Sequence, residues 1–158
     1  MCLAERLGIL DKQNLLTEFN SLVLFRNKRM EELVMSVKIN TNDSRVIQAE
    51  ASGELALEDF EYMMKEWKFR MKNKESVRCI VFLDHVKMPP ASFFKADLDM
   101  AEKYGHKIDR FAVVGDSEWE KKWCHFMRLF AGVEGRYFDR SQKSAAEQWI
   151  RAGLKKAG

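Results

Sequence analysis

Apolar residues follow two different spacings along the chain from about residue 32 onward. Short alternating or continuous apolar runs are typical of strands, whereas apolar positions three and four residues apart are typical of helices that pack on a sheet. The strand pattern covers residues 32–39, 45–53, 77–84, 109–115 and 134–139. The helix pattern covers residues 57–72, 117–131 and 141–154, and a further helix begins with Pro90 in its first turn and ends near Gly105.

The order of these elements predicts a layered α/β domain. Two strands joined by the turn-rich segment 40–44 come first, and helices and strands then alternate to the end. This order predicts a hairpin start followed by right-handed parallel crossovers. The nearly continuous apolar run at 77–84 indicates a central strand that is covered on both faces. Gly105 is expected to end its helix in the left-handed conformation. We therefore predict one compact domain over residues 32–158.

Residues 1–31 form a predicted helical extension. Apolar residues recur there at helical spacing, and a basic cluster follows at 26–29; the apolar positions are Leu15, Leu16, Phe19, Leu22 and Val23. This helix could bind a membrane surface or a partner, pack on its own domain, or precede a natural start at Met30 or Met35. A homodimer follows if the helix docks on a second copy.

Composition narrows the functional classes. The chain has 27 Lys+Arg against 24 Asp+Glu, a net charge of +3, and the two signs are interleaved, which argues against nucleic-acid binding. Its three cysteines are far apart and lack zinc-ligand spacing, which indicates a reducing cytoplasm and no structural zinc or disulfide framework. No run of about 18 apolar residues predicts a transmembrane segment, and the first ten residues do not resemble a signal peptide.

The segment 110–123 raises the question of a phosphate site, because an apolar strand is followed by Gly115 and a helix start. However, Gly115 belongs to neither a dinucleotide-binding nor a P-loop motif. Asp116 places a negative charge there, and Ser117 with Glu120 forms a capping-box pattern that occupies the free helix donors. We therefore expect any ligand nearby to be apolar or cationic.

Other residue types suggest a few candidate binding positions. Asp84 and His85 end the third predicted strand, where open α/β sheets place their ligands, although adjacent strand residues point to opposite faces. Trp119 and Trp123 could line a pocket or belong to the core. The ligand-binding candidates are therefore Asp84, His85, Asp116, Trp119 and Trp123, with no catalytic residue, metal or cofactor predicted.

Several segments together carry a resemblance to a known family. In order and spacing, residues 51–64, 77–84, 109–123, 135–139 and 145–150 resemble the SpoIIAA-like proteins, a STAS-type group of small bacterial proteins, over about residues 34–150. The matching motif residues are Ser52, Gly53, Asp59, Phe60, Val113 to Asp116, Trp119, Ala146 and Trp149. Ala56 departs from the Thr that is usual in the family, which removes a helix cap of about 1 kcal/mol.

The resemblance implies a STAS-like mixed sheet of about five strands with about four helices, a cytoplasmic setting and no known catalytic activity. Anti-anti-sigma STAS domains carry a phosphorylated serine in an Asp-Ser-Ser-Gly type segment. The corresponding segment 83–94 has only Ser92, which follows two prolines, so we expect no phosphorylation switch.

Three functions remain open from the sequence. The first is a non-catalytic module that acts through an unknown protein partner or a small apolar ligand. The second is a carrier of a lipid or other hydrophobic ligand, suggested by the comparison of the family with CRAL-TRIO domains, although about 120 residues leave little volume for a deep cavity. The third is an enzyme that uses Asp84, His85 or Asp116.

Overall fold

The computed structural model describes residues 16–24 and 37–155, and the chain divides into two units, Met1–Met35 and Ser36–Gly158. In the first unit, residues 16–24 are helical, as the apolar spacing predicts. The predicted boundary between the extension and the domain, at residues 31 and 32, lies outside the described residues.

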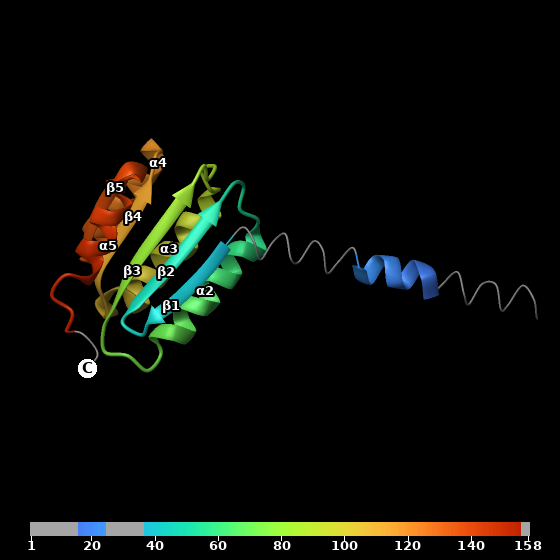
Figure 1. The fold of residues 1–158 in the computed structure, drawn as a ribbon, viewed down its shortest axis with the longest axis horizontal. Helices are drawn as coiled ribbons and strands as arrows, with labels where there is room; N and C mark the ends of the chain where they lie inside the picture. Colours follow the sequence, from blue (N-terminus) through green and yellow to red (C-terminus); the bar gives the residue numbers. More distant parts are fainter. Residues whose placement is uncertain (1–15, 25–36, 156–158) are drawn as a thin grey trace, which may run out of the picture. The chain divides into compact units, whose positions relative to one another are not determined.

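The second unit is a five-stranded sheet with strand order β1-β2-β3-β4-β5 (Figure 1). β1 is antiparallel to β2, and the other neighbouring pairs are parallel, which confirms the hairpin start and the mixed sheet. The strands are β1 (Val37–Asp43), β2 (Val46–Ser52), β3 (Val77–Asp84), β4 (Ile108–Gly115) and β5 (Glu134–Asp139). The helices are α2 (Leu57–Met71), α3 (Ala91–Tyr104), α4 (Glu118–Ala131) and α5 (Lys143–Arg151), with short 3-10 turns at Gly105–Lys107 and Arg140–Gln142.

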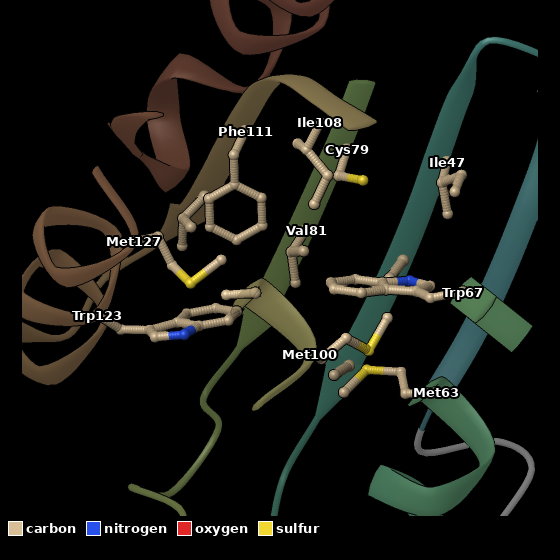
Figure 2. Close-up of a cluster of buried hydrophobic side chains, with 14 of the residues drawn as sticks. Ile47, Met63, Trp67, Cys79, Val81, Met100, Ile108, Phe111, Trp123 and Met127 are labelled. Atoms are coloured by element: carbon tan, nitrogen blue, oxygen red, sulfur yellow. The ribbon is translucent and has the colours of Figure 1, made fainter. Parts of the chain in front are cut away.

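The two faces of the sheet have separate apolar cores. Helices α2, α3 and α4 cover one face, where Trp67, Met100 and Trp123 meet the strand side chains (Figure 2). On the other face, Ala146 and Ile150 of α5 pack on Ile80, Ala112 and Val114. The continuous apolar run of β3 is therefore buried on both sides, as predicted.

The first strand ends later than predicted, and its predicted start at residue 32 lies outside the described residues. The strand pattern ended at residue 39, but β1 continues to Asp43, and only residues 44 and 45 form the turn. The Asp43 carboxylate accepts a hydrogen bond from the backbone N–H of Arg45 at 3.0 Å and so closes this short turn. Polar residues can continue β1 because it is an edge strand, with Asn40 paired to Gln48 across the hairpin.

Gly105 also differs from its prediction, because its φ is −56° and not left-handed. A glycine is favoured at this position because there is little room for a side chain. A Cβ at Gly105 would lie 3.3 Å from the Cβ of Ala131 at the end of α4. The two chain segments therefore approach each other closely, and a 3-10 turn leads directly into β4.

The C-terminal end of α5 is capped by two arginines from the sheet. Arg78 and Arg110 are paired across β3 and β4. Arg78 Nη1 donates to the carbonyls of Ile150 at 3.0 Å and Ala152 at 2.6 Å, and Arg110 Nη1 donates to the Trp149 carbonyl at 2.9 Å. Positive charge beside free carbonyls stabilises a helix C-terminus, so these bonds fix where α5 ends, earlier than the predicted residue 154.

Candidate functional site

The carboxyl ends of three parallel strands bring four polar side chains together. Asp84 ends β3, His85 follows it, Asp116 follows β4, and Arg140 follows β5. Because neighbouring parallel strands end at one edge of the sheet, these positions are adjacent in space. We call Asp84, His85, Asp116 and Arg140 the edge cluster.

Arg140 and His85 link the two carboxylates of the edge cluster. Arg140 forms an ion pair with Asp84, and its Nη1 lies 3.9 Å from Asp116 Oδ2. The same Nη1 lies 3.0 Å from His85 Nε2, while His85 Nδ1 lies 3.5 Å from Asp116 Oδ2. A guanidinium only donates hydrogen bonds, so Nε2 accepts, and the ring proton is placed on Nδ1, facing Asp116.

His85 shares the cluster with Asp84 because of its backbone. On a regular strand the two side chains would point to opposite faces, yet His85 Nε2 lies 3.7 Å from Asp84 Oδ1. His85 lies just beyond β3 and has a φ of 49°. Among the described residues, it is the one residue other than glycine that has a positive φ. The left-handed turn swings the imidazole back over the end of the strand.

The edge cluster is exposed to solvent. The side chain of His85 is 75% exposed, and those of Asp84 and Arg140 are 56% and 46% exposed. Water weakens each of these ion pairs to at most about 1 kcal/mol, so they add little to stability. What the cluster offers is a set of oriented donors and acceptors on the surface.

A buried carboxylate supports the turn that carries Asp116. Glu120 is fully buried, and its Oε2 accepts hydrogen bonds from the backbone N–H groups of Asp116 at 2.9 Å and Ser117 at 3.1 Å. This confirms that Glu120 occupies helix donors that a phosphate would need. Burial raises the pKa of Glu120, partly offset by these two hydrogen bonds. A Cβ at Gly115 would overlap the Glu120 carboxylate, which explains the glycine.

The two tryptophans among the predicted binding residues both lie on α4, which follows Asp116. Trp119 is half-buried, and its Nε1 donates to the carbonyl of Val86, one residue after His85, at 3.3 Å. Trp123 is buried in the core, where its ring packs against Phe93 and Phe111 with centroids 6.0 and 5.3 Å away. Trp119 therefore anchors the loop that carries the cluster, whereas Trp123 lies in the core.

The buried Asp97 is a residue that the sequence pattern did not single out. Its Oδ2 accepts a 2.7 Å hydrogen bond from Trp123 Nε1, and its side chain is 3% exposed. Burial raises the pKa of Asp97 to about 6, and the bond from Trp123 partly offsets this shift. Asp97, Trp119 and Trp123 all line a cavity of about 20 Å³ between the helices and the sheet. That volume suits about one water molecule.

The cysteines and the metal-binding residue types form no further site in the described residues. Burial raises the pKa of Cys79 to about 12 and that of Cys124 to about 11, so both remain thiols at neutral pH. Within residues 16–24 and 37–155, no three His, Cys, Asp or Glu side chains come together in a metal-binding arrangement. None of the helices in this part of the chain has the length and apolar character needed to cross a bilayer.

Comparison with known proteins identifies relatives by fold. The profile of the SpoIIAA-like family matches residues 46–151. A solved structure from Shewanella loihica, an uncharacterised protein with a SpoIIAA-like fold, is similar with a TM-score of 0.54 and 20% identity. The similarity covers 73% of this chain and 94% of that protein. No curated protein sequence matches significantly.

Proposed function

This chain belongs to the SpoIIAA-like family, and we propose that it is a non-catalytic STAS-like module that contacts a protein partner through the edge cluster. The fold supplies a rigid edge to the sheet, and the side chains on that edge determine what it can bind. Asp84, His85 and Asp116 are the predicted binding residues that the fold gathers there, and Arg140 joins them.

The observation that carries the proposal is the conformation of His85. A left-handed φ on a residue with a side chain costs about 1 to 3 kcal/mol and tends to persist where function requires it. Here the strained residue is also exposed, and its ring is held by Asp116 and Arg140. An exposed, oriented imidazole that adds little to stability suits recognition of a partner.

The competing functions receive less support. An enzyme that uses Asp84 and His85 would need a sheltered site, yet both side chains are more than half exposed. A carrier must bury most of its ligand, whereas the enclosed cavity beside Trp119 and Trp123 measures only about 20 Å³ and the larger space, between α2 and α3, is an open groove. We also propose no phosphorylation switch, because the segment around Ser92 lacks the Ser-Gly of the regulated STAS domains.

Affinity purification from the source cells tests this function. The full chain serves as bait beside His85→Ala and Arg140→Gln, and His125→Ala is the control because His125 is also exposed but lies on α4. We expect a partner that is recovered with the parent chain and the control, and about tenfold less with the two edge variants. Equal recovery with all four baits would remove the edge cluster from the contact. Reproducible substrate turnover that His85→Ala abolishes would show an enzyme instead.

A further inference from the structure

An open groove of about 710 Å³ runs between α2 and α3, on the face of the sheet that α2, α3 and α4 cover. Its floor is apolar and is formed by Phe60 and Met64 of α2 and by Phe93 and Met100 of α3. The rings of Phe60 and Phe93 lie 4.3 Å apart at the bottom. The rim includes Leu57, whose side chain is 63% exposed. An apolar floor under a rim with charged residues suits the binding of an amphipathic partner.

The charges along the groove are polarised. Lys65 and Lys68 of α2 and Lys103 of α3 line the end where both helices finish, whereas Leu55 and Leu57 line the end where the helices begin. Among the described residues, none of the three lysines makes an ion pair. Glu61 and Asp99 also line the groove, one helical turn before Lys65 and Lys103, but within residues 37–155 neither carboxylate forms an ion pair with these lysines. The basic end is therefore free to pair with an acidic partner.

We propose that this groove binds an amphipathic helix of a protein partner, with acidic residues at the N-terminal end of that helix. The groove follows α2 from Leu57 to Lys68 and α3 from Ser92 to Lys103, which at 1.5 Å per residue is about 16 Å, or three helical turns. An open groove suits a helix that buries one face and leaves its polar face in water.

The charges also set the direction of the bound helix. Acidic residues in its first turn would lie beside Lys65, Lys68 and Lys103, at the C-terminal ends of α2 and α3. The bound helix then runs antiparallel to α2 and α3. Acidic side chains stabilise a helix N-terminus, and its positive end faces the negative ends of α2 and α3. The proposal does not depend on the edge cluster, so the two can fail separately.

A direct binding experiment uses designed peptides and the full chain. The probe is a fluorescein-labelled helical peptide of about 12 residues, with Glu in its first turn and Leu at helical spacing after it. Its counterpart carries Lys in place of Glu. Fluorescence anisotropy should show the acidic peptide binding about tenfold more tightly, with the difference shrinking as salt rises from about 50 to about 500 mM.

Variants locate the binding to the groove. Ala96 is exposed and lines the groove, so Ala96→Trp should fill it, keep the fold and weaken the acidic peptide about tenfold. The triple variant Lys65→Glu, Lys68→Glu, Lys103→Glu should reverse the preference between the peptides. Lys72→Glu and Lys95→Glu are the controls, because both lysines are exposed and lie outside the groove, and neither should change the affinity.

Three results would overturn the proposal. The first is equal affinity for the acidic and basic peptides, or affinity that Ala96→Trp leaves unchanged. The second is saturable binding of sodium dodecanoate that Ala96→Trp abolishes, without peptide binding, which would assign the groove to a small amphiphile. The third is self-association in sedimentation that Ala96→Trp abolishes, again without peptide binding, which would assign it to a second copy of this chain.

Discussion

The buried Asp97 should make the stability of the domain depend on pH. Its pKa is raised by burial from 3.8 to about 6 in the folded chain. Below pH 3.8 the carboxyl is protonated in both the folded and the unfolded states. As the pH rises from 3.8 to about 6, the unfolded chain loses this proton while the folded chain retains it, so the free energy of unfolding falls. Above about pH 6 both states are ionised and no further loss occurs.

The size of this loss follows from the shift. A difference of about 2.2 pKa units, at 1.36 kcal/mol each, corresponds to an upper limit of about 3 kcal/mol. Asp97→Asn removes the titration and keeps an oxygen that can accept the hydrogen bond from Trp123 Nε1. The variant should therefore gain stability relative to the parent chain as the pH rises, whatever its stability at low pH.

Urea unfolding at several pH values between about 3.5 and 8 measures this difference. Glu120 also has a raised pKa, so the parent curve alone mixes two carboxyls. Subtracting the curve of Asp97→Asn from that of the parent isolates Asp97, because Glu120 titrates in both proteins. A difference between the two proteins that stays constant across this pH range would refute the reasoning, since Asp97 would then have the same pKa folded and unfolded.

Three further predictions concern residues around the sheet edges. Gly115→Ala should cost about 1 to 3 kcal/mol in urea unfolding, because its Cβ overlaps the Glu120 carboxylate. Combined with Glu120→Ala, it should cost less than the sum of the two single costs; purely additive costs would contradict the overlap. His85→Gly should leave thermal stability equal or higher while it reduces partner recovery, because glycine adopts a positive φ without strain; a clear drop in Tm would contradict this account. Arg78→Gln should cost about 1 to 3 kcal/mol and increase amide exchange at the end of α5, whereas Lys38→Gln on the exposed edge strand should change neither.

Much of the fold was predictable from the sequence because buried elements carry strong periodicity. β3 begins and ends where the apolar run does, since both of its faces are covered. The end of β1 was predicted too early, because the residues of an edge strand that face water are free to be polar, and the segment 40–43 resembles a turn. Gly105 was correctly predicted at the end of its helix, but the need for a glycine there comes from a tertiary contact. Its neighbour Ala131 belongs to a segment that no local sequence pattern connects with it.

The candidate site was predictable in part for the same physical reason. Asp84, His85 and Asp116 follow apolar strands, and the carboxyl-edge rule places such residues together. Arg140 lies in a short 3-10 turn after the less buried β5, so by itself it resembles an ordinary exposed arginine. Asp97 lies between Lys95 and Asp99 on α3, where a charged residue normally faces water. In the folded chain it is buried instead, and Trp123 of α4 donates a hydrogen bond to it.

The two proposed surfaces are close enough for one partner to use both. α2 and α3 follow β2 and β3, so the apolar end of their groove starts at the carboxyl edge of the sheet, where Asp84 and His85 lie. A partner that spans both surfaces would lose binding free energy additively when His85→Ala and Ala96→Trp are combined. Two separate partners would each respond to only one of the substitutions. Measuring the double variant against the isolated partner therefore shows whether the edge cluster and the groove form one interface or two.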